Sequence, residues 1–264
     1  GLGSACMTYS RACASSTVSI GEALRRIQRG ESTLMVAGGS ESPLAFTIMR
    51  AWEAMRVVAQ TDADNAYRAC QPFQLGRKGL VLAEGAAALV LEDWDHAQAR
   101  GARIYCEMAG YGQSCDRTHL VRPDAAGQAR AIRAALQDAE LTPHEIDYVN
   151  AHGTATPEGD PVEVEALRQV FAQYAPMLMV SATKSMHGHS LGAVGAIEAA
   201  ITVLALARQA IPPTAHLHTV DPACEGVRHV LGEGLRNVAA RAAISNSFAF
   251  GGSNAVLAMR AVSH

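Results

Sequence analysis

Short apolar runs alternate with helix-forming segments along most of this chain. An apolar run of roughly four to eight residues is typical of a buried strand, whereas apolar residues about three or four positions apart predict an amphipathic helix. Strands that alternate with helices form a sheet covered on both faces, so the pattern predicts an α/β fold. The predicted strands span residues 33–37, 86–91, 104–111, 146–151, 177–182, 243–248 and 255–259, and the predicted helices span 15–29, 128–140 and 192–209, with a short helix before Gly101.

Two details of this pattern make definite structural predictions. The runs 86–91 and 104–111 are separated by a polar segment, and we expect them to continue into the same sheet. Gly30 follows the last apolar residue of the first helix and is expected to end it, because glycine readily adopts the left-handed conformation found after a helix.

The composition is that of a globular chain without a strongly charged surface. Its 264 residues are 49% hydrophobic, which is enough to bury the core of one large domain or two small ones. The 22 basic and 25 acidic residues give a net charge of −3. Because no basic block stands out, we do not expect the chain to bind nucleic acid.

The cysteine pattern predicts a cytoplasmic protein, and the hydropathy pattern predicts that it has no membrane-spanning helix. The six cysteines form no C-x-x-C pair, which favours reduced thiols. The apolar run 194–207 contains Glu198 and is expected to be too short to span a bilayer, and no signal peptide is visible. Gly1 is not an initiator methionine, so we expect the chain to be a piece of a longer protein.

Cys13 lies immediately before the first predicted helix, in the segment YSRACASS. The free N–H groups and the dipole of a helix N-terminus favour a thiolate, so this position suits a nucleophile. A buried free cysteine that only packs is the alternative. Arg11 favours the thiolate if its guanidinium points inward and is a surface cation if it points outward.

Three further segments place reactive or Gly-rich residues at the ends of predicted strands. His152 begins HGTAT, His189 ends KSMHGH, and NSFAFGG spans residues 246–252. In α/β sheets the loops at the carboxyl ends of strands converge on one crevice. We therefore expect the thiol of Cys13 and both imidazoles to meet there.

These four segments, in this order, resemble those of the β-ketoacyl-[acyl-carrier-protein] synthases, condensing enzymes of the thiolase fold. The resemblance extends to residues 37–41, 72–91 and 159–161. It implies a thiolase-like α/β fold layered α-β-α-β-α, with mixed sheets covered by helices. Residues 1–105 would be the remainder of an N-terminal half, and residues 106–264 the C-terminal half. Family members carry further strands and helices before the nucleophile, so the N-terminal part of the first half would be missing.

The resemblance implies a Cys-His-His catalytic triad and no metal or organic cofactor. Cys13 would accept the acyl group, since a thiolate attacks a thioester well and leaves well. His152 and His189 would be neutral and would donate N–H bonds to the enolate formed when a malonyl thioester loses carbon dioxide. The backbone N–H groups of Cys13 and Phe250 would form the oxyanion hole.

Other site residues also follow from the resemblance. Lys184 and Glu163 would form a supporting charged pair, although Glu163 also fits a capping box begun by Asp160. Thr154 and Thr156 would bind the phosphopantetheine arm, and Arg56 would contact the acidic acyl carrier protein. Asp116 and His119 would be polar residues near the site, or else solvated loop residues. Phe248 and Phe250 would form a gate for the acyl chain, or else would be core aromatics.

One alternative concerns metal binding. His187 and His189, with His216 and His218, have a spacing that permits zinc, but no acidic or thiolate partner accompanies them. His187 also stands where the family often has a small residue, and we place it outside the triad.

The function implied by the resemblance is a decarboxylating Claisen condensation in fatty acid elongation. It would join an acyl group on Cys13 to malonyl carrier protein, giving a 3-oxoacyl carrier protein, and the enzyme would be a homodimer or a heterodimer with a related subunit. A stand-alone ketosynthase of a polyketide or polyene pathway is one alternative. A non-catalytic chain-length-determining subunit is another, but such subunits typically lack the nucleophilic cysteine. A degradative thiolase would carry a second cysteine near Gly251, where none occurs.

Overall fold

The structure is a computed structural model that describes residue 3 and residues 5–262. Its larger sheet has six strands in the order β3-β10-β9-β4-β5-β7. The pairs among β3, β10 and β9 are antiparallel and those among β9, β4, β5 and β7 are parallel, so the sheet is mixed as predicted. The strands are β3 (Cys106–Cys115), β4 (Tyr148–Asn150), β5 (Met179–Ser181), β7 (Arg228–His229), β9 (Ala242–Ala249) and β10 (Ser253–Ala261).

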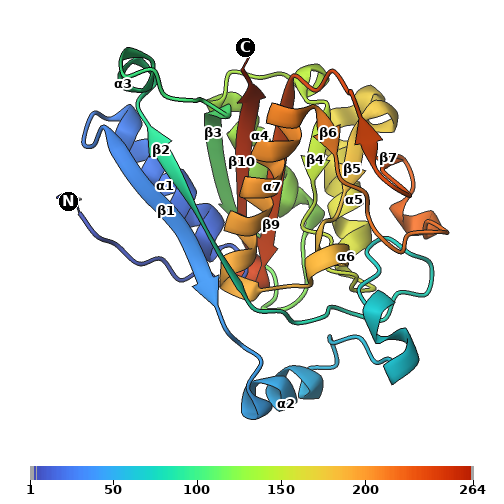
Figure 1. The fold of residues 1–264 in the computed structure, drawn as a ribbon. Helices are drawn as coiled ribbons and strands as arrows, with labels where there is room; N and C mark the ends of the chain where they lie inside the picture. The colour runs from blue at the N-terminus through green and yellow to red at the C-terminus, as the bar shows by residue number, and fades with distance from the viewer. Residues whose placement is uncertain (1–2, 4, 263–264) are drawn as a thin grey trace.

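A second sheet contains only two strands, β1 (Leu34–Glu41) and β2 (Gly85–Glu92), paired antiparallel with Val36 opposite Val90. The expectation that residues 86–91 and 104–111 share one sheet is therefore wrong. The short helix α3 (Trp94–Ala99) joins β2 to β3, but the two strands pair with different partners (Figure 1). The polar segment thus connects two sheets, because strand pairing depends on contacts between residues distant in the sequence.

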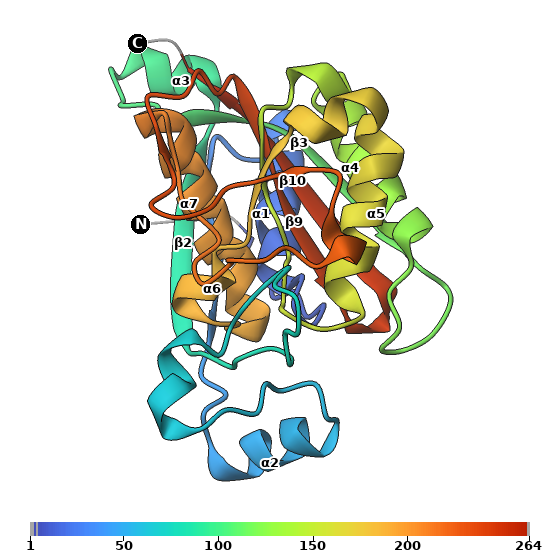
Figure 2. The same cartoon turned by 90° about the vertical axis from the view of Figure 1, so that its right-hand side faces the viewer.

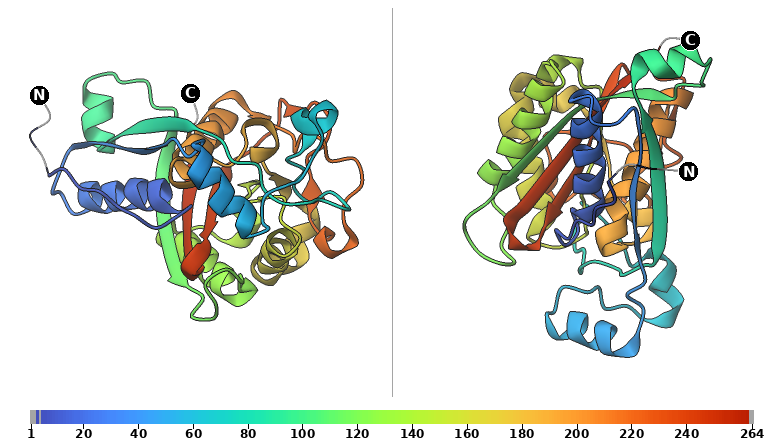
Figure 3. Two further views of the ribbon diagram at one scale, coloured as in Figure 1. Left: turned by 90° about the horizontal axis from the view of Figure 1, so that it is seen from below. Right: turned by 90° about the vertical axis from the view of Figure 1, so that its left-hand side faces the viewer.

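The main helices form two layers (Figure 3). Helices α1 (Ser15–Gln28) and α7 (Val194–Arg208) pack between the two sheets, and α4 (Ala125–Asp138) and α5 (Gly159–Phe171) cover the other face of the larger sheet. One apolar cluster of buried side chains lies on each face of that sheet. Val36 and Val90 on the outer face of the small sheet are 49% and 65% exposed, and none of the described helices covers them.

Helix α1 ends at the predicted position, because Gly30 follows it with φ +69.

The shorter elements lie mostly at the ends of these layers. The shorter elements are α2 (Phe46–Ala54), α6 (Lys184–His187), β6 (Ala210–Ile211), β8 (Leu235–Arg236) and the 3-10 turns Ala63–Arg68, Pro143–Glu145, Ala172–Met177, Leu191–Ala193, Pro222–Cys224 and Phe250–Gly252.

The helical segment Leu191–Arg208, which includes α7, has a mean hydropathy of 1.7 and 18 residues. It is long and apolar enough to cross a membrane, so the expectation that this run is too short is wrong. Half of the segment is buried inside the molecule, where α7 packs against both sheets. A core helix passes the same test of length and composition, and Glu198 on α7 is fully buried.

Helix α2 projects from the layered body (Figure 2). None of its residues is buried, and Phe46 at its start is 81% exposed. It approaches the site through Trp52, whose ring stacks on that of Phe250 at 5.8 Å between centroids.

Candidate active site

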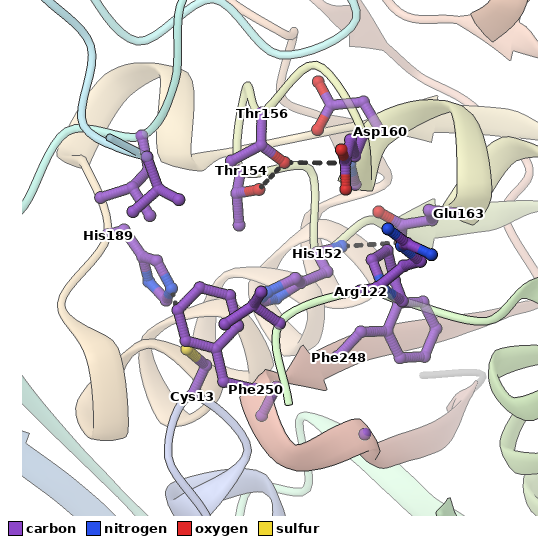
Figure 4. Close-up of a pocket in the computed structure, with 18 of the residues that line it drawn as sticks. Cys13, Arg122, His152, Thr154, Thr156, Asp160, Glu163, His189, Phe248 and Phe250 are labelled. Carbon is purple, nitrogen blue, oxygen red and sulfur yellow. Dashed lines mark hydrogen bonds between the residues drawn. The ribbon is translucent and has the colours of Figure 1, made fainter. Parts of the chain in front are cut away.

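The turn before α1 places Cys13 in a buried position. Ala12 has φ +47, the amide of Ala14 donates to the carbonyl of Arg11, and the helix begins at Ser15. Cys13 is only 6% exposed, and its Sγ lies 3.1 Å from Nε2 of His189 (Figure 4). Arg11 is exposed, which corresponds to the surface position among its two predicted alternatives.

The two histidines join the thiol from separate elements. His152 follows β4, and His189 follows α6. Their rings are nearly perpendicular with centroids 5.5 Å apart. One nitrogen of each ring and the sulfur of Cys13 all lie within 4.8 Å of one another. The structure thus brings together the three side chains that the strand-end argument placed in one crevice.

Burial sets the protonation of all three groups. It raises the pKa of the Cys13 thiol from 9.0 to about 11, while Lys184 and the backbone N–H groups of Cys13 and Phe250 act in the opposite direction. The prediction that this thiol ionises more easily than a free cysteine is therefore wrong, because desolvation of the thiolate exceeds the stabilisation by Lys184 and the two backbone N–H groups. Burial and the nearby Lys184 charge hold the pKa of both His152 and His189 well below 6.5, so the imidazoles are neutral.

Lys184 is paired with Glu198 and not with Glu163, which corrects the expected pairing. Its Nζ lies 2.5 Å from Oε1 of Glu198 and 3.4 Å from Nδ1 of His152. Both members of the ion pair are fully buried, and burial raises the pKa of Glu198 to about 7 against the opposing effect of Lys184. The pair therefore holds a cation beside His152 and keeps that ring neutral.

Glu163 supports the backbone of the histidine loop. Its carboxylate accepts the N–H groups of His152 and Gly153, each at 2.8 Å, and an amide N–H of Asn246 at 3.0 Å. The expected capping box at Asp160 does not form, because α5 begins at Gly159, two residues before Pro161, and Asp160 is therefore inside the helix. A carboxylate with three donors holds the loop in place, and this acceptor role explains why Glu163 is buried without a cation in contact.

Asp160 fastens the other side of the same loop. It accepts the N–H groups of Phe73 and Ala155, and Arg77 lies 3.3 Å away. Burial raises the pKa of Asp160 to about 7 despite these donors. Arg77 also donates to the carbonyl of Thr156, so the buried pair positions this turn.

The Phe250 turn supplies the second backbone N–H of the expected oxyanion hole. Gly251 has φ +81, a conformation that favours glycine, and its N–H donates to the carbonyl of Leu120. The backbone N–H groups of Cys13 and Phe250 both stabilise negative charge on the Cys13 sulfur. The two donors therefore lie beside the sulfur, where the oxygen of an acyl group carried on Cys13 could accept from both.

A pocket of about 390 Å³ opens from Cys13 to the surface. Thr154 and Thr156 line it with their hydroxyl oxygens 3.1 Å apart. The pocket also contains Asp116, which accepts from Asn254, together with Phe248, Phe250 and Arg56. His119 does not line it, because this exposed side chain accepts the N–H of Val121 in its own loop.

The structure reveals pocket and site residues that sequence reasoning did not assign to the site. Glu198 had a visible signal, a lone acid in an apolar helix. Gln128 is 2% exposed and lines the pocket with an unpaired amide oxygen, and Trp52 and Arg122 also line it. A polar side chain on the buried face of an Ala-rich helix was the signal for Gln128, whereas nothing local distinguished Trp52 or Arg122.

The triad donors could hold a metal ion by spacing alone. The Lys184 ammonium beside His152 opposes a cation at that position. Within the described part of the chain, the four histidines considered for zinc do not gather. His187 contacts the hydroxyl of Thr183, and His216 lies edge-on to Tyr67.

Two family models match this chain. The N-terminal domain of beta-ketoacyl synthase matches residues 1–97, and the C-terminal domain matches residues 105–218. The chain belongs to the beta-ketoacyl synthase family. The predicted division at residue 105 remains a prediction.

Two curated proteins illustrate what this beta-ketoacyl synthase family member is similar to. It is 45% identical over 251 residues to nodulation protein E of Rhizobium sp. (strain N33), covering 95% of this chain and 60% of the relative. It is 43% identical to 3-oxoacyl-[acyl-carrier-protein] synthase 2 of Staphylococcus aureus, covering 94% of this chain and 61% of the relative. The chain thus spans about 60% of the length of these curated relatives.

Solved structures of the family share this fold. A type II polyketide synthase acyl carrier protein in complex with its ketosynthase has a matching chain with a TM-score of 0.95 and 34% identity, covering 98% of this chain and 64% of that one. A beta-ketoacyl synthase from Burkholderia phymatum STM815 has a TM-score of 0.91 and 42% identity, covering 96% and 61%. The ketosynthase/chain length factor of ishigamide matches with a TM-score of 0.89 and 36% identity, covering 98% and 61%. The thiolase-like α/β fold predicted from the sequence is confirmed.

Proposed function

We propose that this protein catalyses the decarboxylating Claisen condensation that extends an acyl thioester by two carbons. The observation that carries the proposal is the buried contact of 3.1 Å between the Cys13 sulfur and His189, with His152 beside them. Similarity to a 3-oxoacyl-[acyl-carrier-protein] synthase supports fatty acid elongation. The partner would be an acyl carrier protein, as in the polyketide ketosynthase complex of the same fold.

In the first step, Cys13 takes the acyl group from its carrier. The thioester oxygen is held by the backbone N–H groups of Cys13 and Phe250, and the sulfur attacks the carbonyl carbon. Since the thiol has a raised pKa, it loses its proton only as the C–S bond forms, and the Nε2–H group of neutral His189 donates to the sulfur. The thiol proton passes to the departing thiolate of the carrier, so the charges balance and His189 keeps its N–H for the next step.

In the second step, the malonyl carrier protein loses carbon dioxide. The electron pair of the broken C–C bond forms an enolate, whose oxygen accepts N–H bonds from His152 and His189. Neutral imidazoles suit this role, and the Lys184–Glu198 pair keeps His152 neutral. The enolate carbon attacks the acyl carbonyl, and the Cys13 thiolate leaves.

The rest of the proposed setting follows from this chemistry. Every step uses side chains and backbone of the protein, so no metal or organic cofactor is proposed. The six free thiols suit a cytoplasmic enzyme, and Arg56 at the pocket would contact the acidic carrier. We propose a dimer, with itself or with a related subunit.

Acyl transfer to Cys13 tests the first step. Incubation with acyl carrier protein should add one acyl mass to the protein, located at Cys13 by peptide mass spectrometry, and Cys13→Ala should abolish it. Cys115→Ala is the matched control, since this exposed thiol lies outside the pocket lining. Acylation that persists in Cys13→Ala contradicts the proposal.

Carbon dioxide release from malonyl carrier protein tests the second step. His152→Ala and His189→Ala should each slow release about 100-fold or more, the effect expected for loss of a preorganised donor. His187→Ala should leave it within about two-fold, because this ring contacts Thr183 and lies outside the proposed triad. Unaltered release in both triad variants would refute the histidine roles.

A specialised polyketide pathway is the second candidate. It is favoured by the polyketide ketosynthase complex with a TM-score of 0.95. A non-catalytic subunit is disfavoured by the presence of Cys13 and both histidines in one pocket. Product analysis separates the two catalytic candidates, because an elongating synthase awaits ketone reduction after each cycle and a polyketide synthase adds several units to unreduced chains.

A further inference from the structure

Arg122 is a cation of the pocket that no described carboxylate neutralises. It lies between β3 and α4, lines the same pocket as Cys13 and is drawn in Figure 4. Within residues 5–262, neither Arg122 nor Arg56 forms an ion pair. The pocket therefore presents two guanidinium groups that pair with no carboxylate among residues 5–262.

Most of the acids in the pocket are already engaged by donors. Asp116 accepts from the side chain of Asn254 at 2.5 Å and from the backbone N–H of Asp124. Asp160 and Glu163 are occupied by the backbone and side-chain donors described above. Only Glu158 is an exposed acid without a bonded donor among the described lining residues. The other three acids are buried below the mouth, so among the exposed charged side chains two guanidinium groups face one carboxylate. This excess of exposed positive charge favours an anion as ligand.

The other polar groups of the pocket indicate which kind of anion would bind there. Thr154 and Thr156 offer hydroxyl groups, and Thr156 already accepts the N–H of Gly159 at the start of α5. The buried amide oxygen of Gln128, on the same chain segment as Arg122, lacks a donor. A guanidinium with hydroxyls suits a phosphate oxygen, and an unpaired amide oxygen suits an N–H donor. A phosphodiester followed by amide bonds contains both.

We propose that Arg122 binds the phosphodiester of the carrier protein's phosphopantetheine arm, a specificity role that rests on the proposed function. Arg56 has a different role, because it follows α2, the helix that projects from the layered body and would be accessible to a docked carrier protein. Arg122 binds the phosphodiester of the arm, and Arg56 contacts the surface of the carrier protein. The contributions of the two arginines can therefore be measured separately, with substrates that lack the carrier protein or the phosphate.

Three thioesters of the same acyl group test this assignment: the acyl carrier protein, acyl phosphopantetheine and acyl pantetheine, which lacks the phosphate. The measured quantity is the second-order rate constant of Cys13 acylation by intact mass spectrometry. Arg122→Ala should lower it about ten-fold for both phosphate-bearing substrates and leave acyl pantetheine unchanged. Arg122→Lys should restore part of the loss. Arg56→Ala should affect the carrier protein only.

Arg117→Ala is the matched control, since it removes an exposed cation from the same segment outside the pocket lining. Equal effects of Arg122→Ala on acyl phosphopantetheine and acyl pantetheine, or none on either, would overturn the inference. Titration calorimetry measures binding of phosphopantetheine and pantetheine without the acyl group. It therefore tests the role of Arg122 independently of the proposed condensation activity. Absent acylation with Arg122-dependent binding of phosphopantetheine contradicts the proposed function alone, whereas binding that is independent of Arg122 contradicts this inference.

Discussion

The closed end of the pocket differs from its open end in what holds the side chains. At the closed end, Cys13, His152 and His189 are buried, and internal partners such as Glu163 and Glu198 fix their surroundings. At the open end, Arg56 and Arg122 are exposed and have no ion-pair partner among the described residues. The proposed chemistry, which needs fixed geometry and low polarity, thus lies among buried side chains with internal partners, and the proposed recognition lies among exposed cations.

This comparison predicts that closed-end changes alter reactivity or stability with every substrate, whereas open-end changes alter the response to particular substrates or reagents.

The largest effect is the pH dependence of Cys13 alkylation. Because burial raises the pKa of this thiol to about 11, the thiolate is scarce at neutral pH and increases as pH rises. Alkylation by iodoacetamide should accelerate about ten-fold per pH unit, or about a thousand-fold between pH 7 and pH 10. Mass spectrometry of the Cys13 peptide measures the rate, and a plateau below pH 9 would show that the thiol is already ionised.

Loss of Glu198 should be the most destabilising single change at the closed end. Glu198→Gln leaves the buried Lys184 ammonium without its carboxylate, which typically costs about 3–5 kcal/mol. Urea unfolding at pH 8 measures the free energy. The matched control is Glu165→Gln, which breaks an exposed pair with Arg168 and should cost less than about 1 kcal/mol. Equal losses in both variants would contradict the assigned role of the buried pair.

Glu163→Gln should have a smaller effect on stability and a clear effect on catalysis. The amide presents an NH₂ group to one of the two backbone N–H donors, so the free energy of unfolding should fall by about 1–3 kcal/mol. His152 should then be misplaced, and carbon dioxide release should slow. Glu158→Gln, at the exposed end of the same helix, should change neither quantity; the comparison fails if the two variants behave alike.

The smallest effect concerns the open end. Trp52→Ala removes the stacking partner of Phe250, an interaction worth about 0.5–1.5 kcal/mol, and should free that side chain. Alkylation of Cys13 by the bulkier N-ethylmaleimide should accelerate about two- to ten-fold. Trp52→Phe should retain the slower rate, because it keeps an aromatic partner. An unchanged rate in Trp52→Ala would show that the stack does not restrict access.

Local patterns predicted most of the fold. Apolar periodicity located the main helices and strands, and Gly30 ended α1 as its chemistry requires. The pairing of β2 with β1 was not predictable in this way, because a local pattern does not show which distant strand will be the partner. More than forty residues separate β1 (Leu34–Glu41) from β2 (Gly85–Glu92) in the chain. Strand existence is local, whereas sheet membership is not.

The site divides in the same way. Cys13, His152 and His189 were identifiable because each stands next to characteristic neighbours: Cys13 just before a helix, His152 after a strand and His189 in a Gly-containing turn after α6. The partner of Lys184 was not, since Glu163 and Glu198 are both acids on helices and only packing distinguishes which one reaches the ammonium. A side chain's identity shows what it can bond, but its partner depends on how elements pack.

The amino-acid sequence by itself determined the α/β class, the family and the three groups of the triad, because these follow from periodicity and from ordered motifs. Only the tertiary structure decided their protonation and their partners. A helix start favours a thiolate, yet burial of Cys13 by both histidines, the Phe250 turn and α1 raises its pKa. Desolvation depends on everything that surrounds a group in space, and neighbours in sequence are a small part of that.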